Sequence, residues 1–429
     1  MSNQPINPLS PTPYQSFDLV VLGGGIAGCC MAWESIRRNR RIALVDQPTP
    51  TTSSRVAAGL ITPITGNRLA SSWDFQSFFS SANFFYPYAQ SNSQTTFWSP
   101  KPALRIFTTQ EESELFERKW ENIDESSRSE IQQYGITAKR LPPSYFNPIN
   151  APFGGFSMEP AARLDTNAFL NATHSYLHQC QSLYNAHIDL HSDVIATQEG
   201  FEFPSLKIQS QYLCLALGAA PCPTNLFPSL PLHPARGDIL EILLPTPLNS
   251  LAQQSPTLPL DSVIHRDAWL VPLANNSFLL GATYDRHSLD PTTDSTAGLI
   301  ARQELLNRIN QWFTTPCSSP SNHTIDESSI RHHTIDESSI RNHTIDERSI
   351  QNHRAAVRPA SYDRHPLIGP HPNNTNLLCF NGLGSKGSLM APKLASILWD
   401  SILNRTPIPK NLHWNRRELK SSEPKSKPT

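Results

Sequence analysis

Residues 17–46 read FDLVVLGGGIAGCCMAWESIRRNRRIALVD, and this stretch determines the fold class. Residues 17–22 are an apolar run bounded by glycine, which is typical of a buried parallel strand. Residues 26–38 have a helix-forming composition, and residues 41–45 are a second apolar run that ends in Asp46. The spacing G-x-G-x-x-G lies between the first strand and the helix and is made by Gly23, Gly25 and Gly28. The pattern predicts a strand–helix–strand unit that opens a doubly wound sheet.

Each part of this unit has a physical reason. Gly23 permits a tight turn, Gly25 lets the backbone approach a pyrophosphate, and Gly28 lets the helix pack close to the strand. The helix N-terminus offers unpaired N–H groups to phosphates. Asp46 can accept hydrogen bonds from an adenosine ribose, and its charge argues against the 2′-phosphate of NADP. The unit predicts a dinucleotide site; the alternative is a glycine-rich turn that binds nothing.

Composition sets broad limits on the function. The chain has 429 residues and a net charge of −1, which suggests about two or three domains and gives no electrostatic footprint for nucleic acid or membrane. The chain contains no run of 18 apolar residues, so we expect no transmembrane helix. The polar, Pro-rich start does not resemble a signal peptide, so we expect a cytoplasmic protein. The seven scattered cysteines indicate neither a disulfide framework nor a zinc site, and no metal is predicted.

The segment after Asp46 narrows the class. Residues 53–59 read SSRVAAG, in which small side chains would let a planar ring system lie against the backbone. The order strand–helix–strand, acid, S-S-x-x-A-A-G resembles the FAD-dependent D-amino-acid oxidase superfamily. That group includes glycine oxidase, sarcosine oxidase and an oxidoreductase domain that trims modified tRNA wobble uridines. The resemblance implies a noncovalently bound FAD, with Ser54, Arg55, Ala58 and Gly59 among its binding residues.

A second match lies near the C-terminus. Residues 377–380 are a predicted strand, residues 391–403 a predicted helix, and a glycine-rich loop between them contains Gly382, Gly384, Ser385, Lys386 and Gly387. The order V-R-P-x-x-x-D-x-x-P-L-I-G followed by G-x-G-S-K-G is similar to the C-terminal segment of the family. The resemblance implies that this loop holds the pyrimidine end of the flavin and that Lys386 stabilises negative charge there. The alternative for Lys386 is a solvated loop charge.

Arg358 is the arginine of the R-P pair. In amino-acid oxidases of the family this arginine binds the substrate carboxylate, which suits its planar, permanently charged fork. The alternative is a structural ion pair, for which Asp363 is an obvious partner. The chain also departs from the family pattern, with Ala356 at a usual glycine, Asp238 at a usual glutamine and Trp269 at a usual tyrosine.

Three further matches complete the predicted site. Residues 212–220 form an apolar strand whose Gly218 resembles the position that closes the flavin domain, although a plain buried strand is the alternative. Val194 loosely matches a position that packs on the dinucleotide. Residues 268–284 read as a hairpin turning at Asn275 and Asn276. By resemblance this hairpin walls the substrate pocket with Trp269 and Tyr284.

Residues 323–352 contain three copies of a ten-residue unit, HTIDESSIRH, HTIDESSIRN and HTIDERSIQN. Isoleucine recurs every five residues, which matches neither a helix nor a strand. A metal site built from His323, His333, His343 and His353 is one interpretation. We favour a repeat insertion in a surface loop, because loops accept insertions.

These observations predict a discontinuous Rossmann-like α/β domain that binds FAD and a mixed-sheet α+β substrate domain. The predicted boundaries are 16–75, 150–224 and 353–408 for the flavin domain, 76–149 and 225–320 for the substrate domain, and 321–352 for the insertion, with disordered ends at 1–15 and 409–429. The expected reaction is oxidation of a C–N bond in an amine or amino acid, with hydride transfer to flavin N5, hydrolysis of the imine, and oxygen or a quinone as acceptor. A tRNA wobble-uridine-modifying oxidase and a non-catalytic flavin-binding protein are the alternatives.

Overall fold

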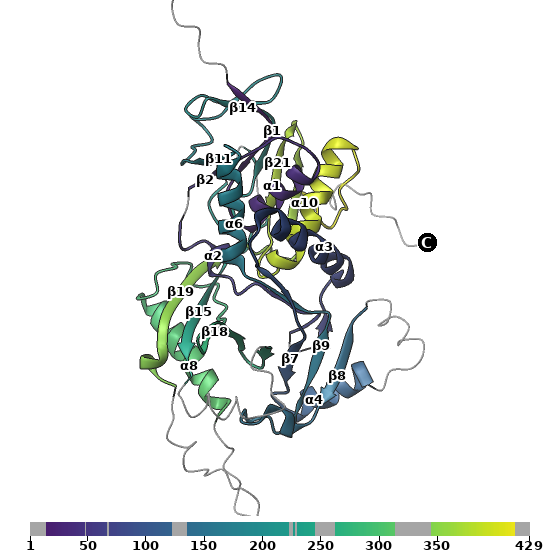
Figure 1. The fold of residues 1–429 in the computed structure, drawn as a ribbon, viewed down its shortest axis with the longest axis vertical. Helices are drawn as coiled ribbons and strands as arrows, with labels where there is room; N and C mark the ends of the chain where they lie inside the picture. Colours follow the sequence, from purple (N-terminus) through teal and green to yellow (C-terminus); the bar gives the residue numbers. More distant parts are fainter. Residues whose placement is uncertain are drawn as a thin grey trace, which may run out of the picture.

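The computed structural model describes residues 14–47, 49–66, 68–121, 135–222, 226–227, 230–244, 262–313 and 345–416. These residues form two lobes, with the N-terminal strand and the C-terminal helix in the same lobe (Figure 1). In the part of the chain that the structure describes, every helix is too short or too polar to span a bilayer.

The first lobe is built on a mainly parallel sheet. Five strands run parallel in the order β11-β2-β1-β14-β21, and β20 pairs antiparallel with β21. Their bounds are Leu183–Asn185 (β11), Ile42–Asp46 (β2), Gln15–Leu22 (β1), Ile208–Leu215 (β14), Asn374–Asn381 (β21) and Leu367–His371 (β20). The strands β13 (Phe201–Phe203) and β12 (Ile195–Ala196) extend the sheet from the first residues of β14. Strand order reverses on either side of β1, which places a crevice at the carboxyl ends of β1 and β14.

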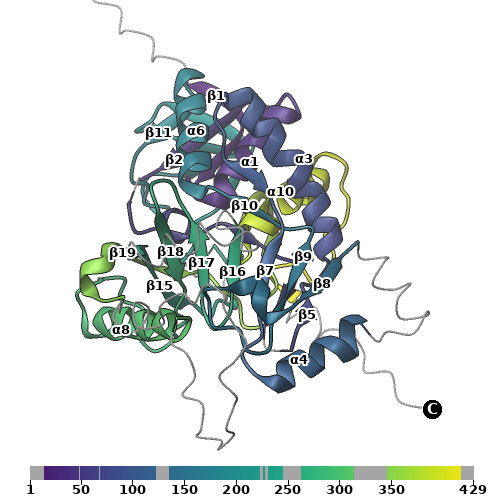
Figure 2. The same ribbon diagram turned by 60° about the horizontal axis from the view of Figure 1, so that its bottom comes forward.

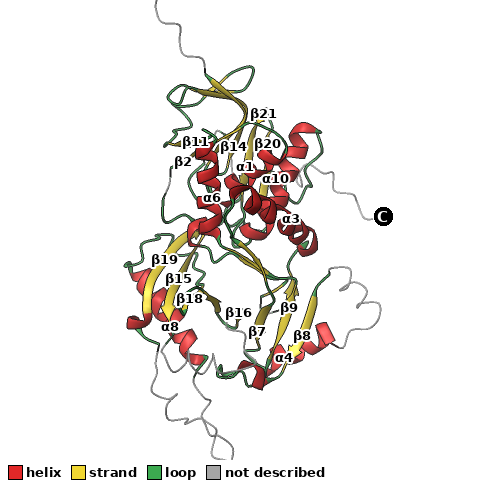
Figure 3. Ribbon diagram, viewed as in Figure 1, coloured by secondary structure: helices red, strands yellow, loops and turns green. Residues whose placement is uncertain are grey.

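Helices cover one face of this sheet (Figure 3). They are α1 (Ile26–Arg37), α3 (Phe75–Ser93), α6 (Thr166–Gln179) and α10 (Gly387–Leu403). Leu19 and Val21 of β1 pack toward them, whereas Val20 and Leu22 pack into a second apolar cluster. Because β1 is buried on both faces, its sequence is continuously apolar rather than alternating.

The second lobe is built on an eight-stranded mixed sheet (Figure 2). The order is β19-β15-β18-β17-β16-β7-β9-β8. The bounds are Ile350–Arg358, Ala235–Leu243, Ser277–Gly281, Trp269–Pro272, Val263–His265, Ala103–Ile106, Gly155–Glu159 and Thr137–Leu141 in that order. The helix α8 (Thr296–Gln311) lies against β15 and β18. The predicted hairpin is confirmed, because β17 and β18 pair antiparallel and Asn275 and Asn276 both have φ of 58° at its turn.

Short elements complete the fold. A three-stranded sheet joins β3 (Leu60–Ile61), β10 (Ala162–Leu164) and β6 (Trp98–Pro100), and β4 (Ile64–Thr65) pairs with β5 (Ala70–Ser71). The short helices are α2 (Ser53–Val56), α4 (Gln110–Phe116), η1 (Glu117–Glu121), η2 (Pro143–Phe146) and η3 (Glu347–Ser349).

The mixed α/β fold with a Rossmann-like lobe agrees with the predicted fold class, but several of the predicted boundaries differ from the structure. The boundary at residue 150 assigned β9 to the flavin domain, whereas β9 pairs with β7 and β8 in the second lobe. The end predicted to be disordered from residue 409 includes Trp414 and Arg416, which are buried. The boundary at residue 76 assigned α3 to the substrate domain; α3 instead packs on α10, and Tyr86 donates a hydrogen bond to the carbonyl of Ser388 at 2.8 Å. The boundary at residue 353 cuts through β19, which pairs with β15 in the second lobe along its length. Most of the repeat insertion, including His323, His333 and His343, lies outside the described residues.

Candidate active site

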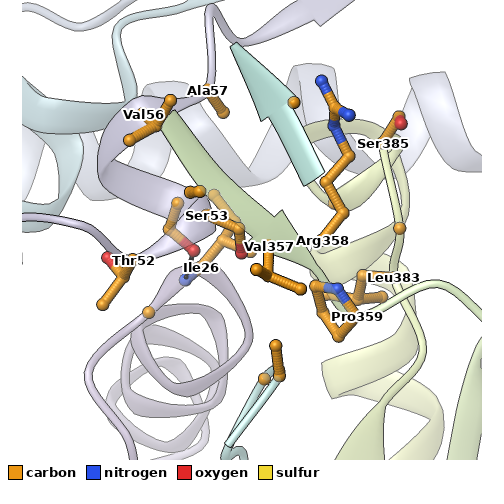
Figure 4. A pocket seen from close by; sticks show the side chains of 18 of the residues that line it. Ile26, Thr52, Ser53, Val56, Ala57, Val357, Arg358, Pro359, Leu383 and Ser385 are labelled. Carbon is orange, nitrogen blue, oxygen red and sulfur yellow. Dashed lines mark hydrogen bonds between the residues drawn. The ribbon is translucent and has the colours of Figure 1, made fainter. Parts of the chain in front are cut away.

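A cavity of about 680 Å³ opens where the two lobes meet, at the carboxyl ends of β1 and β14. Figure 4 shows three separate parts of the chain around it: Ile26 with the segment at Thr52–Ala57, the end of β19, and Leu383 and Ser385 before α10. Of the predicted cofactor residues, the lining includes Gly23, Gly25, Asp46, Ser54, Ala58, Gly59, Gly218, Gly384, Ser385 and Gly387. The fold thus brings both glycine-rich segments to one space.

The first glycine turn has the geometry that its spacing predicts. Gly23 has φ of 107°, and a Cβ there would lie 2.4 Å from the carbonyl oxygen of Ala216, the residue after β14. A Cβ on Gly28 would lie 1.9 Å from the carbonyl oxygen of Gly23. Gly28 is not a lining residue; its role is the close packing of α1 against the end of β1.

Polar groups surround the N-terminus of α1. The backbone N–H of Ile26 donates to Ser54 Oγ at 2.9 Å, and the N–H of Gly24 donates to Asp46 Oδ1 at 2.8 Å. His174, from α6, places Nε2 3.1 Å from the carbonyl oxygen of Gly24, and burial lowers its pKa. No motif marks His174, which comes from a helix far along the chain.

Asn381 joins two of the predicted turns. This buried residue ends β21, and its Nδ2 donates to the carbonyl oxygen of Gly218 at 2.9 Å. Its Oδ1 accepts a hydrogen bond from the N–H of Gly382 at 2.8 Å. A Cβ on Gly387 would lie 3.0 Å from Cγ2 of Ile26, so the start of α10 contacts the start of α1. Asn381 was not predicted, although a polar residue between a buried strand and a glycine is a signal that could have found it.

Arg358, the last residue of β19, also lines the cavity, and Figure 4 shows its side chain extending from the end of that strand. Its Nη1 donates to the backbone carbonyls of Arg236 and Thr283, each at 3.2 Å. A Cβ on Gly237 would lie 2.0 Å from Nη2 of Arg358, so that glycine makes room for the guanidinium. Burial lowers the pKa of Arg358.

The alternative role for Arg358 does not hold. Asp363, its expected partner, instead accepts from Arg416, with Nε of Arg416 2.7 Å from Oδ2. Burial alone would raise the pKa of Asp363, but the hydrogen bonds and charge of Arg416 hold it well below its usual range. Within the described ranges no carboxylate pairs with Arg358. Its charge is left available to the cavity.

A buried network supports the strand next to Arg358. Asp238 and Arg236 are each 1% exposed, and Nη2 of Arg236 lies 2.8 Å from Oδ1 of Asp238. The Asp238 carboxylate also accepts from Thr283 Oγ1 at 3.0 Å and lies 3.0 Å from His353 Nε2. Although burial would raise the pKa of Asp238, these bonds lower it. The departure from the family pattern at Asp238 thus supplies the counter-charge of a buried arginine.

Lys386 lies differently from the prediction. Its backbone caps α10, but its side chain is not part of the cavity lining, and Nζ donates to Ser72 Oγ at 3.1 Å. Burial, reinforced by the nearby Arg364, lowers its pKa. The side chain of Lys386 is half-buried, so the alternative interpretation, a solvated charge on a loop, is wrong. A direct role toward the cofactor stays a prediction.

The remaining predicted residues divide into two groups. Trp269 and Tyr284 line the cavity, with the indole of Trp269 against Gly281. Arg55 and Val194 do not line it. Arg55 donates to Asn171 Oδ1 at 3.0 Å, and its predicted role toward phosphate stays a prediction.

The prediction for Val194 does not agree with the structure. The strand beside β2 is β11, which ends at Asn185 opposite Asp46, so the chain leaves this edge of the sheet before Val194. Val194 packs instead in the apolar cluster beneath the sheet. No group of three or more His, Cys, Asp or Glu in the described part of the chain is arranged to hold a metal ion.

The cavity is lined by a glycine turn at a helix N-terminus, by an acid at the end of the second strand and by a second glycine loop. These features define the class as a dinucleotide-dependent oxidoreductase. The chain belongs to the DAO family of FAD-dependent oxidoreductases, whose sequence model matches residues 18–400. The protein is therefore an FAD-dependent oxidoreductase, and the non-catalytic alternative loses its support.

Solved structures share the fold. Glycine oxidase from Geobacillus kaustophilus superimposes with a TM-score of 0.63 at 16% sequence identity, covering 92% of this chain and 96% of that one. L-proline dehydrogenase from P. horikoshii gives a TM-score of 0.67 at 14% identity, covering 95% and 99%.

A curated relative is the bifunctional protein of tRNA 5-methylaminomethyl-2-thiouridine biosynthesis from Marinobacter nauticus. It is 23% identical over 407 residues, which are 90% of this chain and 55% of that protein. The chain thus spans about half the length of this relative.

Proposed function

We propose that the protein oxidises the C–N bond of a small amine or amino acid that carries a carboxylate, and that Arg358 binds this carboxylate. Bound FAD supplies the acceptor for the hydride that leaves the α-carbon, and the resulting imine is hydrolysed by water. The chain itself contributes binding and orientation, which can supply a large part of the barrier reduction.

The observation that supports this proposal is the state of Arg358. Its guanidinium is buried enough for its pKa to fall, it lines the cavity, and two backbone carbonyls hold one of its nitrogens. A desolvated guanidinium with no carboxylate partner among the described residues favours an anionic ligand, because the ligand restores the missing counter-charge. Its planar fork matches a carboxylate in particular.

The residues around Arg358 are suited to a small substrate. Trp269, Ile239 and Ala282 give the cavity an apolar wall on the side of the second lobe. An apolar wall excludes water and favours the neutral amine over the ammonium ion. The neutral amine is the form that can lose a hydride from its α-carbon. We assign the pocket wall to Trp269 and Tyr284, as the sequence predicted.

Anaerobic reduction of the bound flavin tests the proposal. The FAD-loaded protein is mixed with matched pairs, such as sarcosine and sarcosinamide or proline and prolinamide, and the loss of flavin absorbance is followed. We expect bleaching by at least one carboxylate and a rate at least 100-fold lower for its amide. If amines bleach the flavin equally with and without a carboxylate, Arg358 does not bind a substrate carboxylate. If no amine bleaches the flavin, the proposed reaction class is wrong.

A second candidate is oxidation of a carboxymethylaminomethyl group on a tRNA wobble uridine. The relative from M. nauticus supports this candidate, since its name places it in tRNA modification. The carboxymethylaminomethyl group itself presents an amine next to a carboxylate, as the proposed site for small substrates requires. Analysis of modified nucleosides in tRNA from a strain lacking the gene separates the two. Accumulation of the carboxymethylaminomethyl nucleoside supports the tRNA substrate, and unchanged nucleosides exclude it.

A further inference from the structure

A second arginine, Arg286, does not itself line the cavity but contacts Tyr284, which does; we call the position of Arg286 the rim of the cavity. The backbone of Asp285 forms an isolated antiparallel β-bridge with that of Arg236 in β15. Because side chains alternate along an extended chain, Tyr284 and Arg286 project to the same side. Tyr284 lines the cavity. The guanidinium carbons of Arg358 and Arg286 lie 5.6 Å and 5.4 Å from the centre of the Tyr284 ring. The two charges are therefore no more than about 11 Å apart, with one aromatic ring in contact with both.

Arg286 has no counter-charge among the residues that the structure describes. Its Nη2 donates to the hydroxyl of Tyr284 at 3.1 Å, and its Nη1 lies 2.7 Å from Nδ1 of His233. Its Nε is buried and has no hydrogen-bond partner there. An arginine does not lose its proton, so the half-buried charge remains and lacks an anion.

The nearby carboxylates are engaged elsewhere. Asp285 accepts from the backbone N–H of His287 at 2.7 Å, and Asp290 accepts from Thr292. Asp363 is paired with Arg416. None of the three neutralises Arg286, so the rim and the cavity together present two guanidinium groups to one ligand.

The arginine is held in place by aromatic and imidazole groups. Because an arginine N–H can only donate, Nδ1 of His233 accepts in this contact, which puts the ring proton on Nε2. The imidazole stacks on Tyr362, with ring centres 4.5 Å apart and planes inclined by 26°. A side chain fixed on two sides with donors left over is preorganised to bind, since little rotamer entropy is lost when a ligand arrives.

We propose that Arg286 binds a second oxyanion of the substrate, a carboxylate or a phosphate, at the far end of the molecule from the carboxylate held by Arg358. The inference rests on the proposed function for its substrate and adds the substrate class. The preferred substrates are N-substituted glycines whose nitrogen substituent ends in an anionic group. Arg286 acts in specificity and takes no part in the chemical step.

Flavin reduction with matched substrates measures this preference. The FAD-loaded protein is given N-(2-carboxyethyl)glycine, N-(2-phosphonoethyl)glycine and the neutral analogue N-propylglycine. We expect kcat/KM for one of the dianionic substrates to exceed that for N-propylglycine by about tenfold or more, as one charge-assisted contact supplies. The carboxylate and phosphonate arms distinguish the two sources of oxyanion.

Variants assign the preference to Arg286. In Arg286→Gln the ratio of dianionic to neutral kcat/KM should fall to about one, and Arg286→Lys, which keeps the charge, should restore part of it. Arg348→Gln is the matched control, because Arg348 is exposed and pairs with Asp346 on η3. This control should keep the ratio of the wild-type protein.

A binding measurement separates failure of the inference from failure of the proposed function. Calorimetric titration of the FAD-loaded protein with glutarate and pentanoate needs no turnover, and glutarate should bind about tenfold more tightly in the wild-type protein and in Arg348→Gln. Equal affinities, or a preference that survives in Arg286→Gln, would overturn the role of Arg286 even if amines reduce the flavin. A glutarate preference lost in Arg286→Gln would sustain the second oxyanion site even if no amine in the panel reduced the flavin.

Discussion

Replacing Gly28 by alanine tests the physical basis of the nucleotide cradle. The added Cβ would lie 1.9 Å from the carbonyl oxygen of Gly23 and 3.3 Å from Cγ1 of Val21. The first contact involves backbone on both sides, so no side-chain rotation relieves it. Helix α1 must therefore move away from the end of β1 by more than about 1 Å to restore ordinary contact.

The expected cost follows from this displacement. Overpacking of a well-packed site costs about 1–3 kcal/mol, and the same shift carries the N–H groups of α1 away from the position predicted for the FAD phosphates. At about 1.4 kcal/mol for each factor of ten, we expect the FAD dissociation constant to rise by about tenfold to 100-fold.

Reconstitution of the apoprotein with FAD, followed by quenching of flavin fluorescence, gives the dissociation constant. Gly66→Ala is the control: its φ of 69° makes alanine strain the backbone there, but no heavy atom lies within 4 Å of the added Cβ and Gly66 is not a lining residue, so FAD affinity should be kept. Unchanged FAD affinity in Gly28→Ala, or an equal loss in both variants, would refute the packing argument.

Three other changes probe separate parts of the account. Asn381→Ala leaves two glycine turns without their cross-link, so FAD should bind at least tenfold more weakly; unaltered affinity would argue against a structural link between the turns. Asp238→Asn leaves the charge of Arg236 buried without its partner and should lower the free energy of unfolding by about 3 kcal/mol in a denaturant titration. Asp346→Asn, whose partner Arg348 is exposed, should leave it nearly unchanged. His265 has its pKa lowered from 6.5 to about 3 by burial and then by Arg105, so the unfolded state takes up a proton below pH 6.5 while the folded state does not. Between pH 7.5 and pH 5 this difference should cost about 2 kcal/mol of stability, absent in His265→Gln; identical pH profiles would contradict it.

The local parts of the fold were predictable from the sequence. The strand–helix–strand unit at residues 17–46 is contiguous, and its glycines are required by steric contacts that any protein of this topology makes. The hairpin at 268–284 was predictable for the same reason, because its turn residues Asn275 and Asn276 tolerate positive φ.

Assignments between distant parts of the chain were less secure. The apolar residues of α3 indicate a helix with a buried face but do not say which sheet it covers. β19 was divided at residue 353 because the sequence gives no break between the substrate sheet and the R-P segment, and one strand in fact reaches from the second lobe to the cavity. The short β11 carries no distinct pattern, so the sequence does not show that the chain leaves this edge of the sheet before Val194.

The candidate site shows the same limit. Arg358 was found because a motif carries it, while the choice between a carboxylate anchor and a pair with Asp363 depended on Arg416, 53 residues further on. His174, Asn381 and Arg286 are single residues whose position depends on tertiary structure. No sequence pattern distinguishes such residues from ordinary polar ones.

The most direct test combines one variant with one pair of substrates. Reduction of the bound FAD by a carboxylate-bearing amine and by its amide is measured in the wild-type protein and in Arg358→Ala. Removing the arginine should slow the carboxylate by about 100-fold to 1000-fold, as expected for the loss of a desolvated charge pair, and should slow the amide far less. Equal losses for both substrates, or no loss for either, would contradict the central claim that Arg358 holds a substrate carboxylate in the cavity.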